Sequence, residues 1–272
     1  MAITFGGDEK GEIELRDFLE LVDKSNDVMS RDVLISHAGH LRMLSNNRQF
    51  LANVIIGELK NIYDFQPKNN YTAQTIMLGG VAGKFYVRAN VWLPARLLHP
   101  VNYESEKRLY SFERGHDHNF EFITAGYLGN GYETHIYDYD GNCEGYVGEK
   151  VELKLLERTV LHQHKVMLYR ASRDVHIQKM PADDFSISLN LLAPPIPGSK
   201  QYIFDLESQR IASILRANYI GQSWLIEAAG YLCNDDISDV LASIAGRHCS
   251  AETRRAAQRA LAVRYPDLFP ER

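Results

Sequence analysis

Two histidines, His116 and His118, stand one residue apart in GHDHNFEFITAGYLGNGYETHIY, where an apolar run follows them. On an extended strand, residues i and i+2 project from the same face, so both imidazoles can point to one side of a sheet. Two imidazoles held together can bind a metal ion, and Fe, Zn, Cu and Ni all accept this ligand. The alternative is two polar side chains on an exposed strand face, and the pair alone does not decide between them.

A third histidine extends the pattern. KVMLYRASRDVH joins a strand and a turn to His176, and FSISLNLL follows as a closing strand. Over about residues 72–192, these stretches resemble the two motifs of the cupin superfamily, in the first of which a glycine precedes the HxH pair and a glutamate follows it. The resemblance implies a mainly β fold, a cupin-type double-stranded β-helix (jelly-roll barrel) flanked by N-terminal and C-terminal α-helices, with a metal bound by His116, His118 and His176.

Glu121 departs from that family pattern. It follows His118 after two residues, whereas the family places three or four residues between them. Strict alternation turns Glu121 away from the histidine face, and only a β-bulge would turn it inward. Two ligand sets therefore compete: three histidines, as in the thiol dioxygenases of the same superfamily, or three histidines with Glu121 as a fourth ligand and catalytic carboxylate. We favour the first set.

Three further histidines allow a second hypothesis. His162 and His164 repeat the i, i+2 spacing, and His135 lies on the neighbouring predicted strand. They could form a second metal site and make the centre dinuclear, although exposed histidines bonded to water or to carbonyls are the more common finding. LHQHK also stands where the family has a turn with proline and glycine, which favours a turn position for His162 and His164.

Other candidates would bind or convert a substrate. Arg88, Asn90 and Trp92 alternate along VRANVWL and could line the mouth of the barrel, where an Arg fork matches a carboxylate. Asn190 extends this substrate-binding set, and Tyr169 is a candidate catalytic residue. The alternative is an ordinary structural role for each of them.

The metal decides the predicted chemistry. Three neutral ligands leave open positions on iron for O2 and substrate, so Fe(II) is expected, in a non-heme oxygenase or hydroxylase (a dioxygenase, for example) acting on a small polar metabolite such as an amino acid or its derivative. Zn or Mn in the same ligands would favour an isomerase or a hydrolase. A non-catalytic, ligand-sensing cupin is the third hypothesis.

The surrounding sequence predicts the elements that position these residues. Helical spacing covers residues 13–64, with Ser30 as a predicted cap, and strand-like segments separated by turns start near residue 72. After a proline-rich break, DLESQRIASILRANY and the segments that follow it have helical spacing. The predicted domains are an N-terminal helical region (1–70), a β-barrel (71–197) and a C-terminal helical region (198–272).

Composition excludes several classes of protein. The chain of 272 residues has a net charge of -5 and 45% hydrophobic residues, so broad binding of nucleic acid or of anionic membranes is not expected. Its 3 cysteines form no CxxC pair, which argues against a disulfide framework, and Cys143 in DGNCEG lacks an adjacent base. Without an apparent leader or membrane span, we expect a cytoplasmic protein whose partners are a small-molecule substrate, O2 and a second copy in a homodimer.

Overall fold

The structure is a computed structural model that describes residues 3–25, 29–66, 69, 71, 74–141, 143–182, 184–197, 199–215, 217–232, 237–248 and 251–266. The chain divides into two compact units. The larger, which we call the β unit, is Met1–Cys143 with Val147–Ser213, and the helical unit is Glu144–Tyr146 with Ile214–Arg272. No helix within the described ranges is both long and apolar enough to cross a membrane.

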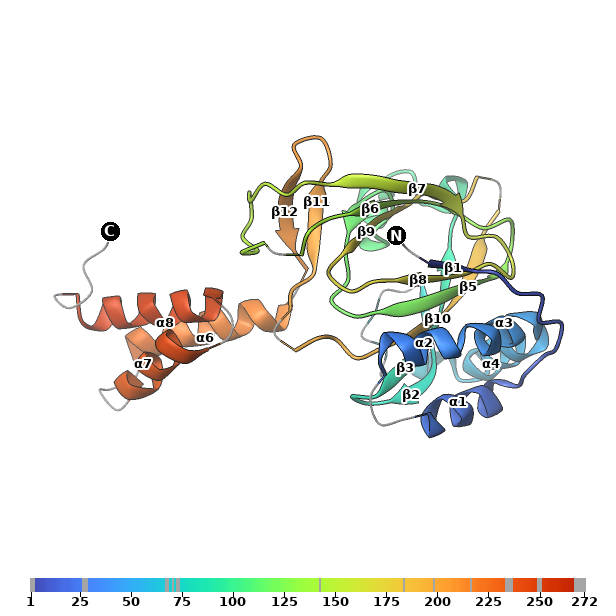
Figure 1. The fold of residues 1–272 in the computed structure, drawn as a ribbon, viewed down its shortest axis with the longest axis horizontal. Helices are drawn as coiled ribbons and strands as arrows, with labels where there is room; N and C mark the ends of the chain where they lie inside the picture. The colour runs from blue at the N-terminus through green and yellow to red at the C-terminus, as the bar shows by residue number, and fades with distance from the viewer. Residues whose placement is uncertain are drawn as a thin grey trace. The chain divides into compact units, whose positions relative to one another are not determined.

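The β unit contains two antiparallel sheets of six strands each (Figure 1). The first sheet has the order β1 (Ile3–Phe5), β8 (Val166–Tyr169), β5 (Phe122–Leu128), β10 (Ser186–Leu192), β3 (Phe85–Trp92) and β2 (Thr75–Val81). The second has the order β12 (Arg210–Ile214), β11 (Tyr202–Asp205), β4 (Gly115–His116), β9 (Asp174–Gln178), β6 (Glu133–Asp138) and β7 (Lys154–Val160).

The chain crosses repeatedly between the sheets. Strands β3, β5, β8 and β10 lie in the first sheet, whereas β4, β6, β7 and β9 lie in the second. A mainly antiparallel β protein with flanking helices is therefore confirmed. The expectation of one closed barrel is not, because the described strands form two separate sheets.

Alternation along the strands gives the first sheet two different faces. On β3, Val87 and Ala89 belong to a core that includes residues of the N-terminal helices, while Trp92 belongs to a second, aromatic core. Arg88 and Asn90, which alternate with Val87 and Ala89, share the Trp92 face. The first sheet thus separates a helix-packed core from the interior between the two sheets.

The N-terminal helices cover the outer face of the first sheet (Figure 1). Ser30 caps one of them by accepting a hydrogen bond from the Val33 amide, as predicted. These helices are α1 (Leu15–Lys24), α2 (Arg31–Ser36), α3 (Ala38–Asn46) and α4 (Gln49–Lys60). Short helices follow at η1 (Ile62–Asp64), η2 (Ala95–Leu97) and α5 (Tyr103–Leu109).

The helix predicted over residues 205–219 is wrong in its first half. Residues 202–214 form the hairpin of β11 and β12, and helix begins at α6 (Ala217–Leu232), followed by α7 (Ser238–Arg247) and α8 (Ala251–Arg264). Tyr202, Ile203 and Phe204 are buried on the strand that pairs with β4, and Asp205 accepts hydrogen bonds in the turn. Pairing with a distant strand therefore overrides the local helical spacing. The predicted domain boundaries stay a prediction.

Candidate metal centre

Three histidines converge between the sheets of the β unit. His116 on β4 and His176 on β9 are directly paired across the strands, and their ring centroids lie 4.4 Å apart. The ring of His118 lies 5.2 Å from that of His116 and 5.0 Å from that of His176. One ligand atom from each histidine lies within 4.8 Å of the others, so the three side chains could bind a single metal ion.

Burial keeps these imidazoles in the form that metals bind. His116 and His176 are buried and His118 is half-buried. Burial lowers the pKa of His116 to about 4, and burial together with repulsion between the rings holds the pKa values of His118 and His176 well below the usual range. All three are therefore neutral near pH 7, and a metal need not displace a proton from a cationic ring.

Hydrogen bonds distinguish the ring nitrogens. The Nδ1–H of His116 donates to the Arg114 carbonyl oxygen at 2.9 Å, because a carbonyl can only accept, and this leaves the His116 Nε2 lone pair free. Neither nitrogen of His176 makes a hydrogen bond of good geometry within the described structure, although both are buried and the Asp174 backbone lies near the ring. Buried polar atoms are normally satisfied, so unpaired imidazole nitrogens beside two other imidazoles fit a metal ion.

The structure does not bring Glu121 to this group. Its carboxylate accepts from the Nε–H of Arg31 at 2.9 Å, and it is not among the side chains whose ligand atoms converge. Phe120 and Phe122 instead contact the His118 ring, with centroids 4.7 and 5.2 Å away. Glu121 lies in the connection between β4 and β5, which belong to different sheets, and its side chain turns to Arg31. This geometry supports Glu121 neither as a ligand nor as a catalytic carboxylate.

The structure does not support the second metal site predicted from His135, His162 and His164 either. Among the described residues, His116, His118 and His176 are the one group of three or more that could hold a metal. The His135 ring instead pairs with Glu133, and His162 Nδ1 bonds to a backbone carbonyl. His164 lies at a turn with a φ of 66°, as its sequence context predicts. These three histidines belong to strand and turn surfaces.

The predicted substrate-binding residues lie in the same interior. Arg88, Asn90 and Asn190 are buried, and Arg88 is close enough for its charge to lower the pKa values of His116 and His118. Trp92 donates to the Ser188 hydroxyl at 2.9 Å and packs in the aromatic core, which is a structural role. Tyr169 stacks on Phe122 and meets the edge of His176 at 4.8 Å.

Sequence reasoning missed two residues that support the histidines. The Gln201 amide Nε2 donates to His118 Nδ1 at 2.9 Å. Asp117, whose side chain is fully buried, accepts from the Tyr202 amide at 2.6 Å and from the Tyr139 hydroxyl. Burial raises the pKa of Asp117 to about 6. Gln201 and Tyr202 lie between the proline-rich break and the predicted helix, in a stretch where no strand was predicted. The one signal in the sequence was the polar residue between the two histidines.

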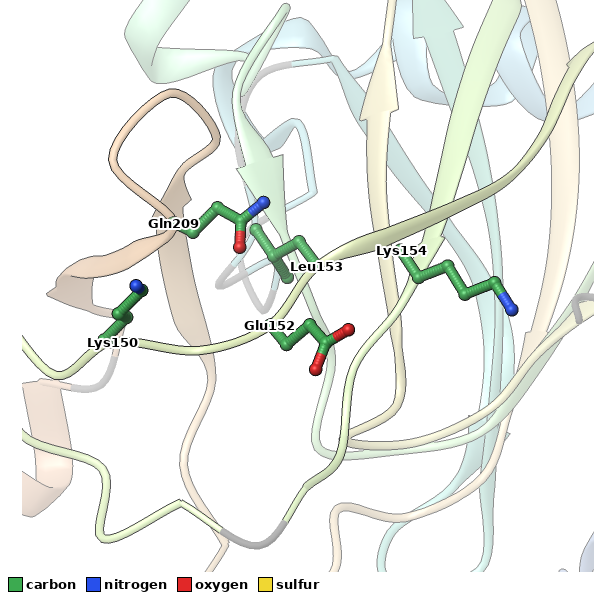
Figure 2. Close-up of a pocket in the computed structure, with 5 residues that line it drawn as sticks. All are labelled: Lys150, Glu152, Leu153, Lys154 and Gln209. Atoms are coloured by element: carbon green, nitrogen blue, oxygen red, sulfur yellow. The ribbon is translucent and has the colours of Figure 1, made fainter.

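A surface hollow of about 630 Å³ lies elsewhere on the β unit (Figure 2). Lys150, Glu152, Leu153, Lys154 and Gln209 line it, and Figure 2 shows their side chains spread apart rather than converging on one point. Its lining includes neither a histidine nor an unpaired buried group. The chemistry of the donors therefore assigns the candidate site to the three histidines and not to this hollow.

No protein-family model matches the chain, and no curated protein matches its sequence. A structure described among the DMSP lyases RdDddP and RnDddQII is 14% identical over 47% of this chain and 50% of that one, with a TM-score of 0.28, so this chain spans half of its length. A Shewanella oneidensis protein is 12% identical over 51% of this chain and 72% of its own, with a TM-score of 0.26. The DMSP lyase DddQ of Ruegeria pomeroyi DSS-3 is 10% identical over 78% of this chain and 82% of its own, again with a TM-score of 0.26.

Proposed function

We propose that the β unit is a cupin-type double-stranded β-helix. Support comes from the order of the eight central strands, β3-β10-β5-β8 in one sheet and β4-β9-β6-β7 in the other, which is the order of a double-sheet jelly roll. The position of the histidines on β4 and β9, facing the interior, adds to this support. The proposal rests on this strand order and on the positions of the histidines.

On this fold we propose a metal-dependent enzyme, with a non-heme Fe(II) oxygenase acting on a small polar metabolite as its leading form. The observation that carries the proposal is the convergence of His116, His118 and His176, with both nitrogens of His176 buried and unpaired. Iron bound by these residues would supply oxygen-activation chemistry.

The protein's own residues prepare the site for such chemistry. Phe120, Phe122 and Tyr169 surround the histidines with aromatic rings, which exclude water and fix the orientation of the imidazoles. Arg88 supplies a positive charge in the same interior, so it could hold an anionic group of the substrate. Binding and orientation would thus come mainly from the first sheet, two of the metal ligands from the second sheet, and His118 from the connection that follows β4.

A zinc- or manganese-dependent isomerase or hydrolase is the second candidate. Tyr169 is the candidate proton donor for such a reaction, because its ring meets the edge of the His176 ring with centroids 4.8 Å apart. A reaction without O2 needs a group that moves a proton, and a neutral phenol in contact with the metal ligands could do so. The metal content of the protein separates the two candidates.

Elemental analysis of protein purified from iron-replete cells tests the metal site. We expect about one metal ion per chain in the wild type, and loss of it in His116→Ala and His176→Ala, because each variant removes one of three ligands. Glu121→Gln is the matched control: it removes a carboxylate that pairs with Arg31, so metal content should persist. Retained metal in both histidine variants would contradict the proposal that these histidines bind it.

An oxygen-electrode assay tests the reaction class. Protein loaded anaerobically with Fe(II) should consume O2 when a substrate from a panel of amino acids and 2-oxo acids is added, and the His176→Ala variant should not. Iron-loaded protein that consumes no O2 across the panel contradicts the oxygenase. Turnover of the same compounds by zinc- or manganese-loaded protein without O2 would then favour the second candidate.

A further inference from the structure

A row of three buried side chains crosses the first sheet on the face that looks toward the histidines. Arg88 on β3 is the direct cross-strand partner of Asn190 on β10, and Asn190 is the partner of Thr124 on β5. Their exposed fractions are 8%, 3% and 1%, respectively. Directly paired residues on one face lie about 5 Å apart, so the row forms one continuous patch.

Each member of this row has a buried polar atom that makes no hydrogen bond of good geometry within the described structure, although the Tyr132 hydroxyl lies near Thr124. The unpaired atoms are Arg88 Nε, Asn190 Nδ2 and Thr124 Oγ1. The first two can only donate hydrogen bonds, and the hydroxyl can donate as well. Leaving a buried donor unpaired costs about 1–3 kcal/mol, so three adjacent unpaired donors point to a bound acceptor.

The charge of Arg88 narrows the nature of that acceptor. Its guanidinium stands over the Tyr71 ring, with Cζ 4.6 Å from the ring centroid, and the other titratable group that acts on its charge is the phenol of Tyr132. Burial lowers the pKa of Arg88, and a hydrogen bond with the Tyr71 phenol only partly offsets this effect. A buried cation without a carboxylate partner is strongly unfavourable, and a bound anion would remove that cost.

We propose that Arg88, Asn190 and Thr124 form the binding subsite for a carboxylate group of the substrate. A planar carboxylate matches the guanidinium fork and presents acceptor oxygens to the amide and hydroxyl donors. One carboxylate balances one guanidinium, whereas a phosphate dianion would bring two charges to a single cation. This inference rests on the proposed function, because it assumes that the bound carboxylate belongs to a substrate. The positions of Arg88, Asn190 and Thr124 do not depend on a bound metal.

Isothermal titration calorimetry on metal-free, full-length protein tests the subsite. Metal is removed with 1,10-phenanthroline, a neutral chelator that adds no competing carboxylate, followed by dialysis. Propanoate is compared with propanamide, which has nearly the same shape without the charge. We expect propanoate to bind at least tenfold more tightly than propanamide. Equal binding of the two, or tighter binding of inorganic phosphate than of propanoate, overturns the proposal.

Two variants locate the binding at this row. Arg88→Met removes the charge and should abolish the preference for propanoate. Asn190→Asp places a carboxylate opposite Arg88, so it should raise the melting temperature and also abolish propanoate binding, because the chain then supplies its own anion. If Arg88→Met does not fold, the wild-type comparison and Asn190→Asp still decide the outcome. Unchanged propanoate preference in Asn190→Asp contradicts the proposal.

Asn47→Asp is the matched control for the second variant. Asn47 is also a buried asparagine, but its Nδ2 already donates to Glu14 at 3.0 Å, so a carboxylate there should lower the melting temperature and leave propanoate binding intact. Because the titrations use metal-free protein, failure of the subsite is distinguishable from failure of the metal centre, which elemental analysis measures separately.

Discussion

At the scale of single residues, the candidate centre depends on which nitrogen of each imidazole carries the proton. The Arg114 carbonyl settles this for His116, since it requires Nδ1–H and leaves Nε2 free. At His118, the partner of Nδ1 is the side-chain amide of Gln201. An amide can donate through its nitrogen or, when turned over, accept through its oxygen, so Gln201 can satisfy either tautomer of His118.

Substitution of Gln201 should weaken metal binding without removing a ligand. Gln201→Met keeps the length of the side chain but leaves His118 Nδ1 without a partner, and loss of such supporting hydrogen bonds typically costs about 10–100-fold in metal affinity. Titration with Co(II), followed by visible absorption, measures the change. Gln163→Met is the control, because Gln163 is also half-buried but accepts from Arg48. Equal Co(II) affinity in wild type and Gln201→Met would contradict this role.

At the scale of elements, residues 193–197 and 199–205 run beside the segment that carries His116 and His118. The backbone amide of Ala193 donates to the Glu121 carbonyl, and that of Ile196 donates to the Asn119 carbonyl. Further along, Ile203 pairs with His116 in the ladder of β11 and β4. The strand β4 is only two residues long, so this pairing and the Asp117 hydrogen bonds hold its conformation.

Removing the Asp117 carboxylate should loosen this contact. Asp117→Ala leaves the buried Tyr202 amide and the Tyr139 hydroxyl without an acceptor, at a cost on the order of 2–4 kcal/mol in the free energy of unfolding. Urea unfolding measures the loss, and Co(II) affinity should fall with it. Asp205→Ala, on the same hairpin but exposed, should change unfolding far less. Equal unfolding free energies in wild type and Asp117→Ala would refute the role of the Asp117 hydrogen bonds in holding β4.

At the scale of the whole molecule, the β unit contains a buried histidine far from the metal centre whose titration affects folding. His37 is 2% exposed; its Nε2 bonds to Ser25 Oγ at 2.6 Å, and the His40 ring lies 5.5 Å away. Burial lowers the pKa of His37 to about 4. Since an unfolded histidine titrates near 6.5, the unfolded chain takes up the proton first as the pH falls.

The stabilisation linked to His37 should therefore be fully present above about pH 6.5 and be lost as the pH falls toward 4. Between pH 7 and pH 5, the loss from this one group is about 2 kcal/mol, because one pKa unit corresponds to 1.36 kcal/mol. His37→Gln should flatten the pH dependence of urea unfolding in metal-free protein by that amount. The control is His99→Gln, because His99 is exposed, and it should not flatten the slope. An unchanged slope in His37→Gln would contradict the explanation.

Short-range periodicity was enough to predict much of this protein from its sequence. The i, i+2 spacing of His116 and His118 and the motif resemblance that added His176 named the three histidines that converge, although β4 ends at His116 and the chain leaves the strand before His118 and Glu121. The strands and most of the helices were also predicted, because their hydrophobic spacing depends only on residues near each other in the chain.

Tertiary structure alone decided which strands became neighbours. The hairpin of β11 and β12 took the place of the first half of a predicted helix, and the pairing of β11 with β4 brought Gln201 to His118. The position of β10 between β3 and β5 aligned Arg88, Asn190 and Thr124. The same packing took Glu121 to Arg31, and among the described residues it did not bring His135, His162 and His164 together as one group of metal ligands. These contacts join segments distant in sequence, and their energies depend on burial and register that no local pattern contains.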